Sequence, residues 1–244
     1  MPEIENSAAS ISIAWILLPA ASTLIFGLLT LWLQPGPRLT SALQHLAAGL
    51  IISAVAVELL PESIGKDQSL PYAIIGYVVG LVVVFGLRTA TKRLDEDSSI
   101  GFIAAVGLDL ALDSILVGIA FTTLAGMGAL VVVGSLSLEI AVLMMATTGT
   151  LLARGTSRKG VVLLTLLLSG IATTAGIGGY YGSSALPANL LTATTSFGIA
   201  ALLYLVVEEL LVDAHQREGE GETMIGSLLF FVGFGVPAFL SASS

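Results

Sequence analysis

Eight apolar runs of about 20 residues follow one another along almost the whole chain of 244 residues. A helical run of this length matches the roughly 30 Å hydrocarbon thickness of a bilayer. The runs are continuous rather than alternating, which favours helices over the strands of a membrane barrel. The composition agrees, because 55% of the residues are hydrophobic and only 11% are charged. The sequence therefore predicts an all-α, polytopic membrane protein, with residues 1–244 forming a single transmembrane domain.

The eight predicted spans are separated by short links that are rich in turn residues. They lie at about 10–34, 39–61, 70–90, 100–125, 128–153, 159–182, 188–213 and 222–241. Eight of the nine lysine and arginine residues fall in or beside alternate links, and only Lys66 falls on the opposite side. Cytoplasmic loops collect these residues. The sequence therefore predicts a multi-pass protein of the cell membrane with both termini outside.

The chain lacks the motifs of several other protein classes. It has no cysteine, which excludes a disulfide framework and a thiolate metal site. It has no nucleophile-elbow serine, no zincin motif and no basic patch for nucleic acid. We therefore expect no enzyme and no nucleic-acid partner, and we expect membrane lipid around the chain. Glycines that would let helices approach closely are Gly118, Gly126, Gly128, Gly134 and Gly149. A homodimer formed through faces of small residues is a further expectation, which the sequence leaves open.

Three carboxylates fall near the centre of predicted spans. Asp109 and Asp113 lie in the apolar stretch "AAVGLDLALDSILVGIAF", four residues apart and therefore on one face of a helix. Glu139 lies near the centre of the next span. An acidic residue at this depth costs a few kcal/mol on insertion scales, so it indicates a function. Because a very short link joins the two spans, we expect the three carboxylates to converge.

Ionised carboxylates that converge in the membrane must be neutralised. No lysine or arginine is expected at their depth, which leaves protons, a bound cation, or both. Oxygen ligands suit hard or borderline divalent cations such as Mn²⁺, Mg²⁺, Ca²⁺ and Fe²⁺. Neutral oxygens could come from Ser114, Ser137, Thr147 and Thr148. The alternative is that all three acids are protonated and hydrogen-bonded to facing helices.

A second group of acids lies at helix ends. It comprises Glu58 and Glu62 at the outer end of the second span, and Glu208, Glu209 and Asp213, with His215, at the inner end of the seventh. Glu62 and Asp213 are expected at the level of the lipid headgroups, where an acid needs no function. Glu58, Glu208 and Glu209 lie deeper, and we expect them to line an entry and an exit and to be further candidates for binding the ion. His45 is expected to be an interfacial or packing residue.

The second and seventh spans resemble each other. The segments "AAGLIISAVAVELLPES" and "FGIAALLYLVVEELLVDAH" each end in Glu-Leu-Leu and a further acid. The two spans cross the membrane in opposite directions in the predicted topology. An inverted repeat of this kind is typical of secondary transporters, whose site lies at midplane between the halves. Chance similarity between helices rich in leucine, alanine and valine is the alternative.

These features together resemble the ZIP (Zrt/Irt-like) family of divalent-metal transporters. Eight spans, both termini outside and a site on the fourth and fifth spans are what that family shows. The second span is similar to the family's second helix, which ends in a polar residue followed by Leu-Leu-Pro-Glu, here residues 58–62. The seventh span, "LLYLVVEELLVDAH", is the closest local match. The resemblance implies a divalent metal ion as substrate, with manganese, iron and zinc as candidates.

The resemblance also implies which residues would bind the metal. The family's fourth helix carries a His-Asn-x-x-Glu/Asp-Gly motif, in which Asp109 takes the histidine place and Asp113 the acid place. Glu139 keeps a carboxylate in the fifth helix. The remaining places of the two motifs fall to Leu110, Ser114, Leu138 and Val142. The resemblance therefore implies a single-metal site rather than a two-metal centre, and the lost histidine weakens the case for zinc.

We therefore expect a ZIP-like transporter that moves a divalent cation through a mid-membrane carboxylate site. Because the cation would displace protons from the carboxylates, transport should depend on pH. Two alternatives remain. The first is a non-transporting, ZIP-like membrane sensor or scaffold with protonated acids, and the second is a proton- or sodium-coupled solute carrier.

Overall fold

The structure is a computed structural model that describes residues 14–33, 35–65, 70–93, 99–124, 126–217 and 223–242. The described residues form helices and no strand. The helices are α2 (Leu18–Leu33), α3 (Pro37–Ala54), η1 (Val55–Leu59), α4 (Leu60–Ile64), α5 (Leu70–Arg93), α6 (Ser99–Thr123), α7 (Met127–Ala153), α8 (Arg158–Ser184), α9 (Ala188–Leu205), η2 (Val206–Leu210), α10 (Leu211–Arg217) and α11 (Thr223–Ala242). The prediction of an all-helical chain is confirmed over these residues.

The helices coincide with the predicted spans. Among the described residues, seven continuous helical segments are long and apolar enough to cross a membrane, and Met224–Leu240 in α11 forms a shorter eighth. The second and seventh segments each combine three elements, Pro37–Ile64 and Ala188–Gln216. The chain is therefore built as a multi-pass membrane protein. The sidedness of the termini stays a prediction, and Lys66, on which it partly rests, lies outside the described residues.

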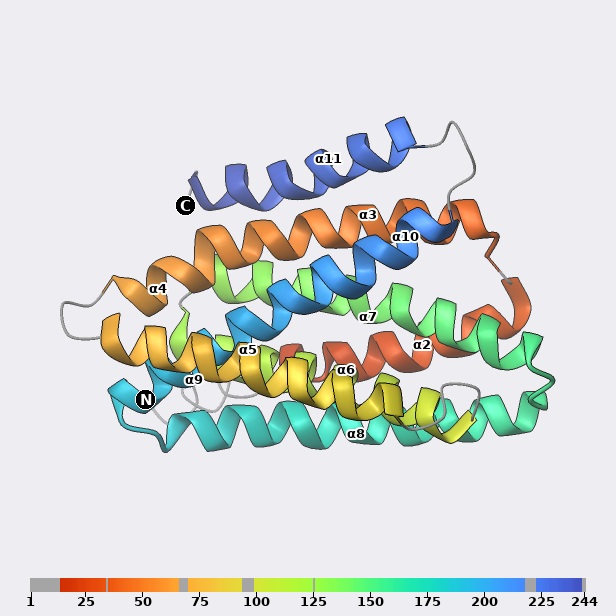
Figure 1. Ribbon diagram of the computed structural model, residues 1–244, viewed down its shortest axis with the longest axis horizontal. Coiled ribbons are helices and arrows are strands. Elements are labelled where there is room, and N and C mark those ends of the chain that lie inside the picture. The colour runs from red at the N-terminus through yellow and green to blue at the C-terminus, as the bar shows by residue number, and fades with distance from the viewer. Residues whose placement is uncertain are drawn as a thin grey trace.

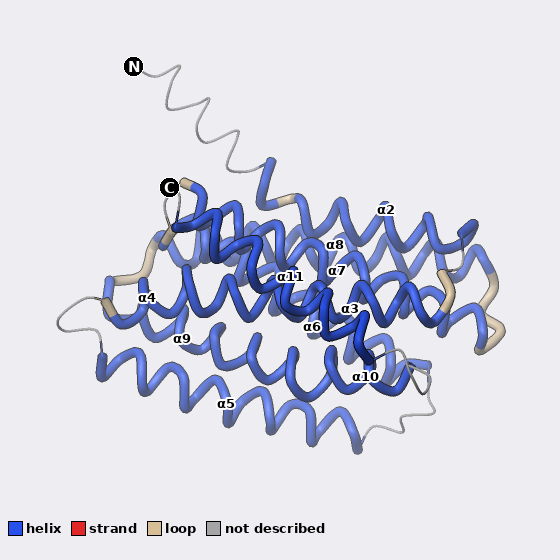
Figure 2. The backbone as a smooth tube through the Cα atoms, turned by 90° about the horizontal axis from the view of Figure 1, so that it is seen from above, coloured by secondary structure: helices blue, strands red, loops and turns tan. Residues whose placement is uncertain are grey.

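The helices lie side by side in one elongated bundle (Figure 1). The most extensive contacts join α3 to α11, α6 to α8, and α5 to α9, while α2 packs on both α7 and α8. Figure 2 shows α5 at the edge of the bundle, beside α9. Large apolar side chains such as Val82 and Phe85 on α5, and Phe239 on α11, are more than half exposed. This is the exterior expected of helices that face lipid rather than water.

The two segments that resemble each other in sequence also share a local distortion. Each contains a π-helical turn, η1 in one and η2 in the other. The Leu60 N–H donates to the Val55 carbonyl and the Leu211 N–H donates to the Val206 carbonyl, so each bond reaches back five residues instead of four. A π turn holds one extra residue and often marks a functional position in a helix. Glu58 and Glu209 occupy corresponding places in the two turns.

Close packing of α6 on α8 depends on glycine. A Cβ atom built on Gly118 would overlap the backbone of Gly176, and one on Gly179 would overlap the backbone of Ile115. The prediction that Gly118 permits a close helix approach is confirmed. It is wrong for Gly134 and Gly149, where added Cβ atoms would meet nothing within 4 Å. Spacing in the sequence does not show which face of a helix meets a neighbour.

The α6–α8 contact predicts different effects for two adjacent glycines of α8. Replacement of Gly179 by alanine should lower stability, because overpacking typically costs about 1–3 kcal/mol. Replacement of Gly178 by alanine should not lower stability, because its Cβ position is open. Both replacements bring the same gain in helix propensity, so the comparison isolates the effect of packing. Thermal unfolding in detergent, followed by circular dichroism, should give a lower Tm for Gly179→Ala than for Gly178→Ala. Equal Tm values would contradict the close approach.

Candidate functional site

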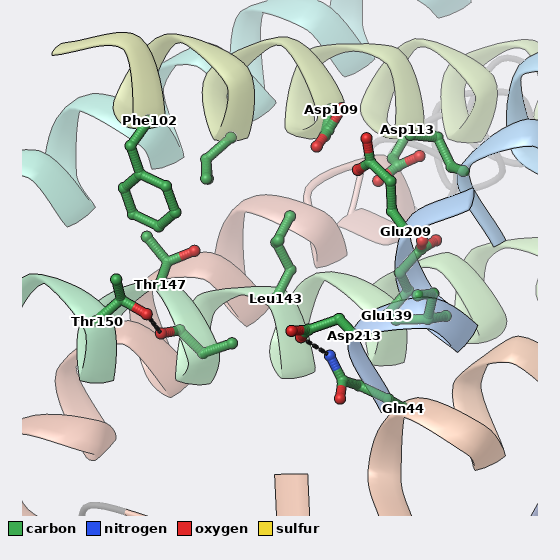
Figure 3. Close-up of a pocket in the computed structure, with 14 residues that line it drawn as sticks. Gln44, Phe102, Asp109, Asp113, Glu139, Leu143, Thr147, Thr150, Glu209 and Asp213 are labelled. Atoms are coloured by element: carbon green, nitrogen blue, oxygen red, sulfur yellow. Dashed lines mark hydrogen bonds between the residues drawn. The ribbon is translucent and has the colours of Figure 1, made fainter. Parts of the chain in front are cut away.

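A cavity of about 220 Å³ lies inside the bundle, among residues of α3, α6, α7 and the segment that runs from α9 through α10. Its polar lining comes from Gln44, Asp109, Asp113, Glu139, Thr147, Thr150, Glu209 and Asp213, and its apolar lining from Phe102, Val106, Leu143, Ala146, Leu205 and Leu210. Figure 3 shows Asp109 and Asp113 projecting from α6 on one side, and Leu143, Thr147 and Thr150 on α7 on the other. The cavity is the largest concentration of acidic side chains within the described bundle.

The three carboxylates predicted at mid-membrane depth all line this cavity. Asp109 and Asp113 lie one turn apart on α6, and Glu139 reaches the cavity from α7. All three are buried, with exposed fractions of 7%, 1% and 6%. Glu209 joins them from the π turn η2. The expected convergence is therefore observed, although nothing in it identifies a ligand.

The expectation that no basic residue reaches these carboxylates is wrong. Arg88, near the end of α5, lies between two of them. Its Nη2 donates to Asp109 Oδ1 at 2.5 Å, and its Nη1 lies 2.5 Å from Glu209 Oε1. The Arg88 side chain is only 11% exposed. Arg88, at the end of the predicted span 70–90 and counted among the residues in or beside the links, is thus part of the buried site.

Helix geometry explains how Arg88 reaches this depth. Arg88 lies five residues before the end of α5, and Asp109 lies ten residues after the start of α6, which follows along the chain. At a rise of 1.5 Å per residue, these positions are about 7.5 Å and about 15 Å from the end of the bundle that the two helix termini share. Side chains in a helix lean toward its N-terminus. Arg88 therefore leans away from the near surface and toward Asp109.

The other two central carboxylates have no such partner. Asp113 Oδ1 and Glu139 Oε2 are buried and accept no hydrogen bond within the described part of the chain. Ser137 Oγ, two residues before Glu139, is also without one. A buried carboxylate that is ionised and unpaired is costly enough that it takes up a proton or a cation. The cavity is therefore lined by two kinds of acid, one paired with arginine and one with a carboxylate oxygen that has no hydrogen-bond partner among the described residues.

Sequence reasoning missed the contribution of α3. Gln44 Nε2 donates to Asp213 Oδ2 at 2.5 Å, and both side chains line the cavity. Asp213 was expected at the headgroup level without a function. Its place in the cavity follows from the packing of α10 against α3. Gln44 did not stand out in the sequence, because it follows Thr40 and Ser41 and precedes His45 near the start of its span.

The remaining candidate residues lie elsewhere. Glu58, in η1, approaches the start of α7, where a Cβ atom on Gly128 would overlap its carboxylate. Glu208 is exposed, and neither acid lines the cavity. His45 is buried and its ring centroid lies 5.0 Å from that of His215, which suits the packing role expected for it. Of the candidate hydroxyls, Thr147 lines the cavity.

Two other candidate hydroxyls are already used within the bundle. Ser114 Oγ donates to the Leu110 carbonyl on its own helix, and Thr148 Oγ1 donates to the Gly27 carbonyl on α2. Neither lines the cavity. Within the described ranges, no three histidine, aspartate or glutamate side chains lie in an arrangement that could hold a metal ion. The cavity thus presents carboxylates without a closed coordination shell.

Comparison with known proteins does not assign the chain to a family. No protein-family model matches it, and no curated protein sequence matches it significantly. The resemblance to ZIP transporters stays a prediction from the motifs described above. The class that the fold itself supports is a multi-pass helical membrane protein.

The two aspartates of α6 should differ in their effect on stability. Asp109→Asn removes the charge that pairs with a buried guanidinium, which should cost about 1–3 kcal/mol. Asp113→Asn replaces a carboxylate whose Oδ1 has no partner, and it should change stability by less than about 1 kcal/mol. Thermal unfolding in detergent without divalent ions compares the two. A loss of stability that is equal in both variants would contradict the pairing of Arg88 with Asp109.

Proposed function

We propose that the chain is a membrane transporter of divalent metal cations, of a ZIP-like kind, and that the ion passes through the cavity between α6 and α7. One observation carries this proposal. Asp113 and Glu139 are buried carboxylates that face a cavity in a membrane-spanning bundle and lack a partner at one oxygen each. A divalent cation is a ligand that would neutralise both at once.

Each polar residue has a role in this proposal. Asp113 and Glu139 are the first ligands, Asp109 is the third, and Thr147 or water completes the shell. All of these are oxygen ligands, which favours Mn²⁺ and Fe²⁺ over Zn²⁺, for which histidine is a common ligand. Because the side chains are not in a metal-holding arrangement without the ion, binding has to draw α6 and α7 together. Protons leave the carboxylates as the ion enters.

The position of the cavity supports one direction of access. Its lining extends from Asp113 and Glu139 to Thr150, three residues before the end of α7, and to Asp213 near the end of the seventh segment. This end of the bundle also holds the junctions that carry most of the arginine and lysine residues. The distribution of those residues predicts that it is cytoplasmic. We infer that this conformation is open toward the cytoplasm.

The paired π turns support an exchange between two such conformations. The two segments that contain η1 and η2 resemble each other in sequence, and each packs on a peripheral helix, α11 in one case and α5 in the other. An inverted repeat would relate an inward-open to an outward-open state by the movement of one helix group against the other. Glu58 would then occupy, on the outer side, the place that Glu209 has on the inner side.

A second function is favoured by the pairing of Arg88. Because Arg88 already neutralises Asp109 and Glu209, the site could be held permanently closed to ions. The chain would then be a non-transporting sensor or scaffold. A proton- or sodium-coupled solute carrier, in which Arg88 contacts an anionic solute, is the related alternative. Measurement of flux distinguishes these alternatives from divalent-metal transport.

The test is uptake of Mn²⁺, Fe²⁺, Co²⁺, Zn²⁺ and Cd²⁺ into proteoliposomes that contain the wild-type protein or a variant. We expect saturable uptake in the wild type, with Asp113→Asn and Glu139→Gln lowering it by about tenfold or more, as loss of a metal ligand does. Glu208→Gln is the matched control, since Glu208 is exposed and lies outside the cavity. Folded wild-type protein that takes up none of these ions would overturn the proposal.

A further inference from the structure

Arg88 joins three elements of the bundle at one point. Its guanidinium lies on α5 and contacts Asp109 on α6 and Glu209 in η2. The contacts are not alike, because the Asp109 side chain is 10% exposed and the Glu209 side chain is 36% exposed. One positive charge thus bridges a deeply buried carboxylate and a more accessible one.

Resting on the proposed function, we propose that Arg88 is a tethered cation, which occupies the carboxylate site when no metal is bound and leaves Asp109 when a divalent cation arrives. In the metal-bound state Arg88 keeps its contact with Glu209. The role of Glu209 is therefore to receive the displaced guanidinium rather than to bind the metal. Arg88 and the metal ion compete for one carboxylate.

Competition follows from the spacing of the carboxylates. Asp113 lies one helical turn from Asp109, and both line the cavity. Once α6 and α7 have drawn together around a metal ion held by Asp113 and Glu139, Asp109 would be the next carboxylate along the same helix face. A divalent cation and a guanidinium at neighbouring positions repel each other, the more strongly because the site is buried. When a protein group occupies the site, the apparent affinity for the ligand is the intrinsic affinity multiplied by the fraction of molecules in which that group is not bound.

Charge balance favours the exchange. Without metal, one guanidinium faces Asp109 and Glu209, while Asp113 and Glu139 take up protons. With metal, the two charges of the ion face Asp109, Asp113 and Glu139, and the guanidinium keeps its pairing with Glu209. Each state leaves about one negative charge in excess, so the exchange adds no uncompensated buried charge.

The exchange also changes which helices are tied together. Apart from this ion pair, α5 makes only slight contact with α6, whereas it packs extensively on α9. Release of Asp109 would therefore remove the main tie between α5 and α6, while α6 would keep its packing on α9. Metal binding would in this way be coupled to the relative movement of helices that alternating access requires.

The experiment measures the Kd for Mn²⁺ by isothermal titration of the purified full-length protein in detergent. Arg88→Gln should bind Mn²⁺ about tenfold more tightly or better, because no competitor remains. Glu209→Gln should bind it about tenfold more weakly, because the displaced guanidinium then loses the carboxylate that receives it. In the double variant Arg88→Gln, Glu209→Gln, the second change should have no further effect, which a direct ligand would not show. Arg158→Gln, on the exposed start of α8, is the control for loss of one positive charge.

The outcomes separate the two proposals. Equal Kd values for the wild type and Arg88→Gln, together with loss of binding in Asp113→Asn, would overturn the role of Arg88 and leave the proposed function intact. Absence of Mn²⁺ binding in folded wild type and in folded Arg88→Gln would overturn the proposed function itself. If Arg88→Gln does not fold, Arg88→Lys provides the same comparison. An ammonium cannot bridge two carboxylates in the bidentate manner of a guanidinium, so a Kd below that of the wild type is again expected, and an unchanged Kd overturns the inference.

Discussion

The electrostatic cost of burying carboxylates in a membrane-spanning bundle governs the arrangement around the cavity. An acid in a low-dielectric interior needs a counter-charge, a proton or a bound ion. The bundle provides the first through Arg88, which reaches Asp109 and Glu209. It provides no counter-charge in direct contact with Asp113 or Glu139 within the described residues. The two pairs of acids therefore differ in how their charge is balanced, by arginine in one pair and by a proton or a ligand in the other.

Local helix geometry determines which acids reach Arg88 and which do not. The one-turn spacing on α6 directs Asp109 and Asp113 toward the same cavity. The π turn η2 places Glu209 beside Arg88, while the adjacent Glu208 faces outward. On the opposite side of the cavity, α7 contributes Glu139 and Thr147 to the lining. A cation that bound here would contact helices from different parts of the bundle, which is the arrangement that couples binding to helix movement.

Much of the site could be predicted from the chain, and the failures have physical reasons. Asp109, Asp113 and Glu139 were found because an acid in an apolar run of 20 residues is conspicuous, and their convergence followed from a short link. Arg88 and Gln44 were missed because both lie toward the ends of their spans, where a polar residue is ordinary. Only the lean of the Arg88 side chain toward the N-terminus of α5 brings it to Asp109. The prediction that Gly134 and Gly149 permit a close helix approach was wrong, because spacing alone does not show which helix face meets a neighbour.

The sequence by itself determined the class of protein, because the length and continuity of the apolar runs leave membrane-crossing helices as the structure that satisfies the backbone. It also determined the depth of the central acids, because the rise of a helix converts position in a span into distance. The tertiary structure decided which of those acids are paired with arginine within the chain and which keep an oxygen without a partner among the described residues. That outcome depends on side-chain direction and on contacts between Arg88, Asp109 and Glu209, whose residues are 21 and 121 positions apart. No local pattern in the sequence can encode such contacts, because they exist only when the helices are packed.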